Sequence, residues 1–532
     1  MCSYNAVNGV PACADKRVMT TLMRQTWNFS GSIVSDDGAV QQIANGMTAG
    51  NLHGHGYVHS VPAAAAAALE GGCDVDYGGG YSSGAQSAVD QGLIDEQTIA
   101  SAVRRSLSTR MQMGEFDERQ ASSATWDGNP WNSTRLNLGV IDSAAHRALA
   151  WRAAAESIVL LENAEAPRGL PIQSDSLASN SKVVAVLGEG ANDSHAVVNR
   201  YTGTQTNIVT LLDGIRNRAG ADGLVVRYSE NDTSVAIGAS VVIVVVRSNE
   251  EGESHDRQNL TMRPADSDML VQLHARKTNS ATSGLVAAQV IVVVISGGPV
   301  DTSEPAEVMA SGLITSVVAA WQPGEEAGNA VAGLLWGDVD FSASLAVTAY
   351  RQRFTSSVDI ANISVAGRGY RFLRDQSLAL YKYGHGLSYN SWSAPSLSWS
   401  HDHTGATRGD VRNTRSVTVQ IRNTGTRVGS RSILLFAQRL SSGRIATEVE
   451  NTDVIWPNKW LIAFNKARNV KPGQSWRGTL TFGDEELSRW TTTLANQTES
   501  LSAGFRVFNG EYLLTVVDQH GAPAANLTLS IS

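Results

Sequence analysis

Short, almost uninterrupted apolar runs alternate with helix-like segments through the middle of the chain. Four runs rich in Val and Ile occupy residues 183–187, 224–228, 241–246 and 290–295. Strands that are buried on both faces of a parallel sheet have this pattern, because neither face meets water. A helical pattern precedes these runs from residue 144, and another helix is expected over residues 329–335. We therefore expect an α/β sandwich over residues 143–389.

The first 120 residues contain more helix-like segments and fewer strands. Helices are expected over residues 16–27, 61–71 and 93–116, and the chain is expected to pass from a strand into another helix over residues 35–46. The helix at 61–71 has a proline near its first turn and stops at Gly71, and Asp95 and Glu96 fall in the first turn of the helix at 93–116. These patterns predict two or three β/α units.

The last part of the chain has the two-residue period of half-buried strands. Examples are residues 416–423, 432–438 and 512–517, and Asn-Thr-Gly, Pro-Gly and Asn-Gly turns lie between such segments. This pattern predicts an all-β sandwich over residues 390–532. Residues 121–142 are polar, carry Trp and Asn, and are expected to form a linker between domains.

Composition excludes several functional classes. The net charge is -8 and no basic stripe is present, which argues against a nucleic-acid partner. No apolar run reaches the roughly 18 residues that a membrane span needs. The three cysteines lack metal-ligand spacing. Cys2 and Cys13 are candidates for a disulfide in an oxidising compartment, and Cys73 is expected to be a buried small hydrophobe.

Two carboxylates follow the short apolar run that ends at Ser35. Active sites of α/β proteins lie where parallel strands end, so Asp36 and Asp37 are candidate catalytic groups. The alternative is that both residues cap the helix expected after them.

Several sequence motifs resemble family 3 of the glycoside hydrolases. These motifs are M-C-S-Y-N-A-V-N-G at residues 1–9, G-S-I-V-S-D-D-G-A at 31–39, G-C-D-V-D-Y-G at 72–78 and Y-K-Y-G-H-G-L-S-Y at 381–389. Residues 417–429 and 470–473 resemble the fibronectin type III-like domain of the same family. The resemblance implies a multidomain α/β plus all-β fold: the C-terminal part of a TIM-like (β/α) barrel over 1–120, an α/β sandwich over 143–389, and a fibronectin type III-like β-sandwich over 390–532.

The resemblance also implies a retaining glycosidase, which needs two carboxyl groups about 5–5.5 Å apart. Asp36 matches the family's nucleophile. The acid/base is expected in the loop at residues 247–264, where Glu253 lies three residues before an Asp-Arg pair; Glu250 and Glu251 are rivals. Asp256 and Arg257 are expected to pair and shape this loop. A solvated acidic loop without catalytic function is the alternative.

Three further residues are expected to bind substrate. Met1 and Tyr4 match the Met and Tyr that line the family's subsite for the terminal sugar, although a core tyrosine and an exposed terminal methionine are the plain alternatives. Asp37 stands where similar relatives have Trp or Cys, and it places a second negative charge beside the nucleophile.

The expected function is release of terminal sugars, with β-D-xylosidase activity on xylan-derived oligosaccharides favoured. Gly38 is more like the β-glucosidases, which keeps that activity as an alternative. A third hypothesis is an inactive remnant with a carbohydrate-binding or scaffold role. No cofactor or metal is expected, the partner is an oligosaccharide or glycoside, and the oligomeric state stays open.

The beginning of the chain bears on activity and location. Met1 coincides with a methionine that is internal in the family, so the sequence is expected to be truncated and to lack the earlier strands that hold the sugar's hydroxyls. We expect such a chain to be poorly active and aggregation-prone. Eight Asn-X-Ser/Thr sequons are compatible with a secreted glycoprotein, so we expect an extracellular location.

Overall fold

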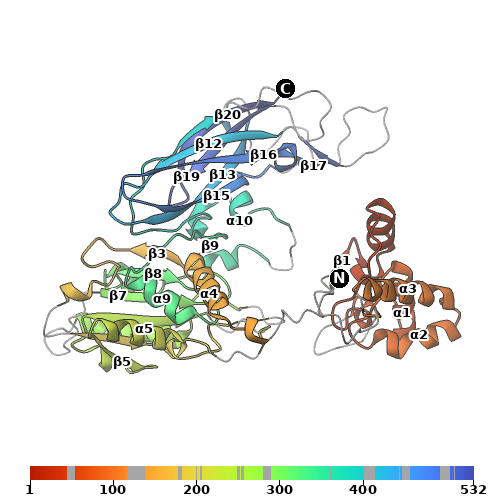
Figure 1. The fold of residues 1–532 in the computed structure, drawn as a ribbon, viewed down its shortest axis with the longest axis horizontal. Helices are drawn as coiled ribbons and strands as arrows, with labels where there is room; N and C mark the ends of the chain where they lie inside the picture. Colours follow the sequence, from red (N-terminus) through yellow and green to blue (C-terminus); the bar gives the residue numbers. More distant parts are fainter. Residues whose placement is uncertain are drawn as a thin grey trace, which may run out of the picture. The chain divides into compact units, whose positions relative to one another are not determined.

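The computed structural model divides the chain into two compact units, Met1–Ile141 and Asp142–Ser532. Both units are drawn in Figure 1. The structure describes residues 1–44, 54–113, 115–116, 138–177, 182–198, 201–203, 207–248, 252, 257–278, 289–359, 362, 364–400, 414–441, 444–445, 456–491, 504–507 and 510–531.

Helices dominate the first unit. They are the π-helix η2 (Arg17–Thr26) and the α-helices α1 (Val61–Gly71), α2 (Gly80–Asp90) and α3 (Glu96–Gln112). A small antiparallel pair joins β1 (Ala6–Val7) to β2 (Val10–Pro11). Three further segments run parallel through the bridges Cys2↔Ser35 and Val34↔Val75. The helices η2 and α1 lie between these segments in sequence, which is the order of a β/α arrangement.

Helix α1 begins and ends where the sequence predicts. The side chain of Ser60 accepts a hydrogen bond from the Ala63 amide, and Pro62 occupies the first turn, where its missing N–H costs nothing. Gly72 ends the helix with a φ of 110°, and its amide donates to the carbonyl of Ala68.

The prediction of a helix over residues 35–46 was wrong. Only a short 3₁₀ turn, η3 (Gln41–Ile43), forms in the part of this segment that the structure describes. Ala44 is extended and forms a parallel bridge with Val58, so the chain leaves the helical conformation there.

Two other predictions about helices in the first unit need correction. The helix expected over 93–116 is shorter, because Asp95 is extended and its side chain caps the amide of Thr98. Helix α2 was not predicted. It contains two glycines and three serines, whose low helix propensity hides it.

The second unit is built around a six-stranded sheet with the order β3-β8-β7-β6-β4-β5. Its strands are β3 (Val159–Asn163), β4 (Val183–Leu187), β5 (Val225–Ser229), β6 (Val241–Arg247), β7 (Gln289–Ile295) and β8 (Ser316–Ala319). All neighbours are parallel except β3 and β8. The four predicted Val- and Ile-rich strands, which are β4 to β7, are confirmed within one residue at each end, whereas β3 and β8 were not predicted.

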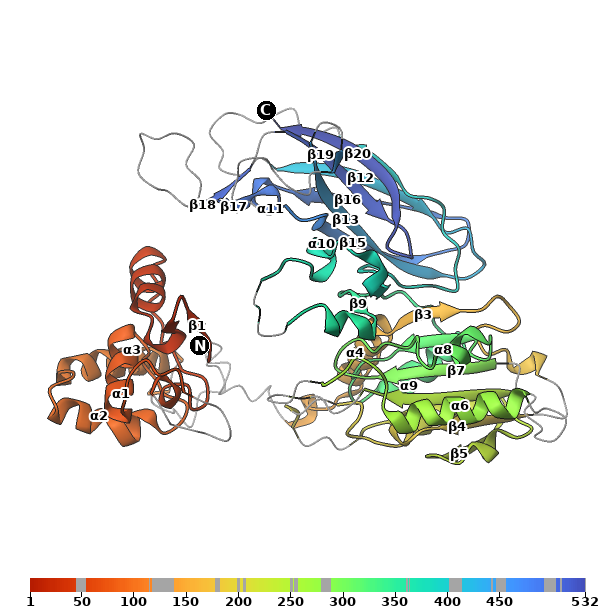
Figure 2. The same ribbon diagram turned by 180° about the vertical axis from the view of Figure 1, so that it is seen from behind.

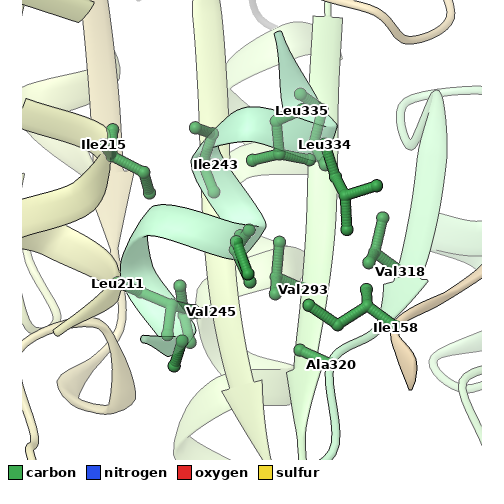
Figure 3. Close-up of a cluster of buried hydrophobic side chains, with 14 of the residues drawn as sticks. Ile158, Leu211, Ile215, Ile243, Val245, Val293, Val318, Ala320, Leu334 and Leu335 are labelled. Carbon is green, nitrogen blue, oxygen red and sulfur yellow. The ribbon is translucent and has the colours of Figure 1, made fainter. Parts of the chain in front are cut away.

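Helices cover both faces of this sheet. Helices α4 (Ala144–Ser157), α5 (Leu211–Ala221) and α9 (Ala327–Leu335) pack on one face, as Figure 1 shows. Helices α6 (Pro264–Thr278) and α8 (Ala306–Ala310) pack on the other face, seen in Figure 2. Figure 3 shows Leu334 and Leu335 of α9 against strand residues such as Val293. The expected α/β sandwich is therefore present.

A separate all-β layer follows in the same unit. One sheet has the order β11-β12-β16, and the other has the order β14-β13-β19-β20 with β15 paired to β13. The strands are β11 (Ser396–Trp399), β12 (Arg415–Arg422), β13 (Gly429–Ser441), β14 (Arg444–Ile445), β15 (Trp460–Val470), β16 (Ser475–Phe482), β19 (Gly510–Val517) and β20 (Pro523–Ile531). One buried apolar cluster takes residues from both sheets.

Polar contacts join the α/β sandwich to the β layer. The carboxylate of Glu156 on α4 pairs with Lys466 and Arg468 on β15, both at 2.8 Å. The carboxylate of Asp340, a half-buried residue, accepts hydrogen bonds from Ser388 Oγ and Asn390 Nδ2, both at 2.7 Å. These contacts make the two layers one compact unit.

Candidate active site

Three parallel strand segments of the first unit end close together. The amide of Asp36 donates to the carbonyl of Cys2 at 3.1 Å, and the amide of Ser35 donates to the carbonyl of Val75 at 2.8 Å. Because parallel strands end at the same edge of a sheet, the residues that follow them share that edge. Tyr4, Asp36 and Asp76 are therefore neighbours despite their separation in sequence.

Asp36 follows the middle segment and is half-buried. Its Oδ1 accepts a hydrogen bond from the amide of Asp37 at 2.8 Å, which fixes the orientation of the carboxylate. The alternative that Asp36 and Asp37 cap a following helix was wrong, because η3 begins after Val40 and has no side-chain cap. The carboxylate of Asp36 is thus held at a strand end and not used to start a helix.

Tyr4 and Asp37 are in direct contact. The hydroxyl of Tyr4 donates to the backbone carbonyl of Asp37 at 2.7 Å, so this hydroxyl lies beside the residue that follows Asp36. Tyr4 also packs against the apolar cluster of the first unit, so it contributes to the core as well. The side chain of Asp37 is exposed, and Met1 is 76% exposed.

His55 belongs to this cluster and was missed in the sequence. Its Nε2 lies 2.6 Å from the carbonyl oxygen of Tyr4, and its backbone amide donates to the carbonyl of Gln42 at 2.7 Å. Since this contact uses a backbone carbonyl 51 residues away in sequence, no local pattern predicts it.

Asp76 is a second carboxylate at this edge that sequence reasoning did not select. Its Oδ1 lies 3.3 Å from the hydroxyl of Ser35, and its Oδ2 accepts from the amide of Tyr81 at 3.0 Å. Ser35 Oγ in turn accepts from the amide of Tyr77 at 2.8 Å. Asp76 therefore organises the strand ends around Asp36. Asp76 lies in the motif G-C-D-V-D-Y-G, and this motif was the feature of the sequence that could have marked it as a strand-end carboxylate.

The cysteines lie directly beneath this edge. Cys2 and Cys13 form a disulfide, and Cys73 is buried as a free thiol, as the sequence predicts. Burial raises the pKa of the Cys73 thiol to about 11, which suppresses its reactivity. The disulfide closes the segment that carries Tyr4, so it restricts the position of that ring.

The predicted acid/base loop is only partly described. Glu250, Glu251, Glu253 and Asp256 lie outside the described residues, so the expected pairing of Asp256 with Arg257 is not tested. Arg257 is described, and its Nη1 donates to the carbonyl of Pro299 at 3.0 Å. The loop follows β6, at the carboxyl edge of the second unit's sheet.

The described residues offer neither a metal-binding cluster nor a membrane-spanning helix. Within the described ranges, no group of three or more His, Cys, Asp or Glu side chains is placed to hold a metal ion. None of the helices that the structure describes has the length and apolar character needed to cross a membrane.

Comparison with known proteins matches most of the chain to one family. The glycosyl hydrolase family 3 N-terminal domain matches residues 1–109, and the family's C-terminal domain matches residues 158–389. The probable beta-D-xylosidase 7 of Arabidopsis thaliana is 30% identical over 493 residues, which are 85% of this chain and 59% of that protein. The exo-1,4-beta-xylosidase of Emericella nidulans is 26% identical over 92% of this chain and 58% of its own length. The chain thus spans slightly under three fifths of the length of these two relatives.

Solved structures show the same fold. A GH3 exo-beta-xylosidase in complex with a xylobiose aziridine activity-based probe superposes with a TM-score of 0.76 at 23% identity, over 100% of this chain and 66% of that one. The beta-D-glucoside glucohydrolase from Trichoderma reesei gives a TM-score of 0.71 at 23% identity, over 100% of this chain and 73% of that one. The two family matches together cover more than half of the sequence, and the chain therefore belongs to glycosyl hydrolase family 3.

Proposed function

We propose that this protein is a retaining exo-β-glycosidase that releases terminal xylose from xylan-derived oligosaccharides. The observation that carries the proposal is the carboxylate of Asp36, oriented at the end of a parallel strand segment beside Tyr4. Relatives named as xylosidases support the choice of sugar.

In the proposed reaction, Asp36 attacks the anomeric carbon and forms a covalent glycosyl-enzyme. Glu253 protonates the leaving oxygen and then deprotonates the water that releases the sugar. Tyr4 fixes the backbone next to the nucleophile, and His55 holds the carbonyl of Tyr4. Hydrogen-bonding side chains at the strand ends would bind the hydroxyl groups of the terminal sugar.

The nucleophile is tested by trapping with a 2-fluoro xyloside and by a matched pair of variants. Asp36 is expected to carry the label. Asp36→Asn should lower kcat by at least about 1,000-fold, which is roughly 4 kcal/mol of transition-state stabilisation. Asp37→Asn changes the neighbouring, exposed carboxylate and should lower kcat by no more than about tenfold. Label on another residue, or equal losses in the two variants, would contradict the assignment.

The acid/base is tested by azide rescue. Glu253→Ala should lose most activity and regain it with azide, because a small anion can attack the glycosyl-enzyme without a general base. Glu251→Ala and Glu250→Ala serve as controls, and rescue of either one in place of Glu253→Ala would move the role to that residue.

β-Glucosidase activity is the second candidate, favoured by Gly38 and by the fold shared with a glucohydrolase. Comparison of aryl β-xyloside with aryl β-glucoside decides between them. We expect kcat/KM to be at least about tenfold higher on the xyloside, since the hydroxymethyl group of glucose needs additional space. A non-catalytic carbohydrate-binding role would give binding without turnover on both substrates.

Two structural details and a location belong to the same proposal. We propose that residues 1–120 form the C-terminal part of a TIM-like barrel and that residues 390–532 form a fibronectin type III-like domain. An extracellular location is supported by the Cys2–Cys13 disulfide, because disulfides persist in oxidising compartments.

A further inference from the structure

The second unit contains a polar pocket of about 600 Å³, well within the usual size of small-molecule sites. Three segments form its walls: the loop after β7, the turn η9 (Gln352–Ser356) with the residue before it, and the turn η10 (Gln376–Leu378) with the start of β10 (Ala379–Tyr381). The charged and amide side chains of the lining are those of Asp301, Glu304, Arg351, Gln352, Arg353 and Gln376. No residue proposed above for catalysis lines it.

Hydrogen bonds between the walls hold the pocket open before any ligand arrives. Asp301 is buried, and its Oδ2 accepts from the amide of Gln352 at 2.6 Å. Its Oδ1 accepts from the hydroxyl of Ser303 at 2.6 Å. Arg353 Nη2 donates to the carbonyl of Ser377 at 2.6 Å, which joins the second wall to the third. A preformed pocket loses little entropy when a ligand binds.

The side chains that line the pocket favour an uncharged ligand with many hydroxyl groups. Two arginines are balanced by Asp301 and Glu304, so neither an isolated anion nor an isolated cation gains net attraction. Among the described residues that line the pocket, Ala379 alone has an apolar side chain. A hydroxyl group both donates and accepts, and it therefore suits alternating guanidinium, amide and carboxylate groups.

Hydrogen-bonding capacity remains on several walls. Arg351 is half-buried, and its guanidinium has no hydrogen-bond or ion-pair partner in the part of the chain that the structure describes. Gln376 Nε2 donates to the carbonyl of Leu373, and its Oε1 accepts no hydrogen bond from the described residues. Glu304 Oε2 accepts from the amide of Ala306, and Oε1 has no such partner there. One donor group and two acceptors can thus serve a ligand.

The pocket also holds the chain downstream of the proposed acid/base. The amide of Leu260 donates to Gln352 Oε1 at 2.6 Å, and the amide of Asp301 donates to the carbonyl of Leu260 at 2.6 Å.

We propose that this pocket is a second carbohydrate-binding site that takes a neutral sugar unit of an oligosaccharide, such as a xylose residue. The choice of xylose rests on the proposed function, whereas the neutral polyhydroxyl class rests on the pocket alone.

Hydrogen–deuterium exchange of the full chain with and without xylobiose tests this proposal. The Asp36→Asn background prevents hydrolysis of the probe. Xylobiose should slow exchange in peptides covering residues 301–306, 351–356 and 376–381. Adding Arg351→Ala should weaken the xylobiose affinity measured from this protection at least about tenfold, which corresponds to ~1.4 kcal/mol. Arg216→Ala, which removes an exposed arginine of α5, is the matched control and should leave the affinity unchanged.

The outcomes separate the pocket from the proposed function. The proposal that this pocket binds a sugar would be overturned if these peptides were not protected, or if the Arg351→Ala and Arg216→Ala proteins had equal affinities. Either result would count against the pocket even if the protein hydrolyses aryl xylosides. Protection by glucuronate and not by xylobiose would contradict the proposal that the ligand is uncharged. Protection that is lost in Arg351→Ala would support the pocket even if the wild-type chain hydrolyses no glycoside. An unchanged melting temperature of Arg351→Ala excludes a folding defect as the cause.

Discussion

At the scale of single residues, Asp74 links several parts of the first unit. Its buried carboxylate pairs with Arg24 of η2 at 2.6 Å and with Arg105 of α3 at 2.7 Å. It also accepts the amide of Ile33 at 2.9 Å, on the strand segment that leads to Asp36. One carboxylate thus connects two helices to the candidate active site.

We expect Asp74→Asn to destabilise the first unit by about 2–3 kcal/mol, because both guanidinium groups lose their charged partner. The estimate lies below the usual cost of breaking a buried pair, since both arginines are partly exposed. Urea unfolding measures the change. Asp90→Asn on the surface of α2 is the control and should change stability by less than about 0.5 kcal/mol.

His385 gives the second unit a pH dependence. Burial lowers its pKa, and its Nε2 lies 2.8 Å from the carbonyl oxygen of Leu161. The hydrogen bond to the Leu161 carbonyl opposes this lowering of the pKa, as do the charges of Glu162 and Asp518, whereas nearby His520 adds to it. The folded protein therefore favours the neutral ring, and the unfolded chain takes up the proton at higher pH.

The contribution of His385 to the free energy of unfolding is therefore fully present above about pH 6.5, the pKa of histidine in the unfolded chain. This contribution is lost as the pH falls from there toward the lower pKa of His385 in the folded protein. We expect the melting temperature of the second unit to drop between pH 7 and pH 5. His385→Gln should show a smaller drop over the same range. An identical pH profile in both proteins would show that other groups cause the dependence.

At the scale of elements, two helices of the first unit end at glycines that differ in the space available for a side chain. Gly72 follows α1 with a φ of 110°, and an added Cβ would lie 2.7 Å from Thr20 Oγ1. Gly92 follows α2 with a φ of 67° and has open space around the same position. Both positions strain a residue with a side chain, but only the first also produces a clash.

We therefore expect Gly72→Ala to cost about 2–3 kcal/mol of unfolding free energy and Gly92→Ala only about 1 kcal/mol. Thermal unfolding of the two single variants gives the comparison. Equal losses would indicate that Thr20 moves aside without cost.

The sequence predicts elements well where burial alone determines them. The run Val183–Leu187 forms β4 with the expected bounds, because an all-apolar segment between turns has few alternatives. Helix α2 was missed because its stability comes from packing on α1 and not from its own composition. Tyr4 and Asp36 were found through a strand-end motif. His55 and Asp76 were not, because their contacts with Tyr4 and Ser35 depend on tertiary structure.

At the scale of the whole molecule, the two units have separate cores. Two buried apolar clusters consist of residues from the first unit, and three others consist of residues from the second. Units with separate cores need not unfold in one transition.

We expect two thermal transitions, of which Asp74→Asn lowers only one. Alkylation of Cys73 reports the first unit, because its buried thiol becomes reactive only when that core opens. Labelling of Cys73 at the temperature of the lower transition in the variant would identify it. A single transition that shifts as a whole would mean that the units unfold together.

The contacts of Glu156 and Asp340 also decide where this protein can be divided for engineering. A cut at Asn390 would separate Glu156 from Lys466 and Arg468 and remove Asn390 Nδ2 from the Asp340 carboxylate, leaving charged groups without partners on both fragments. A cut before Asp142 preserves all of these pairs. Shortened or hybrid versions should therefore exchange residues 142–532 as a single module.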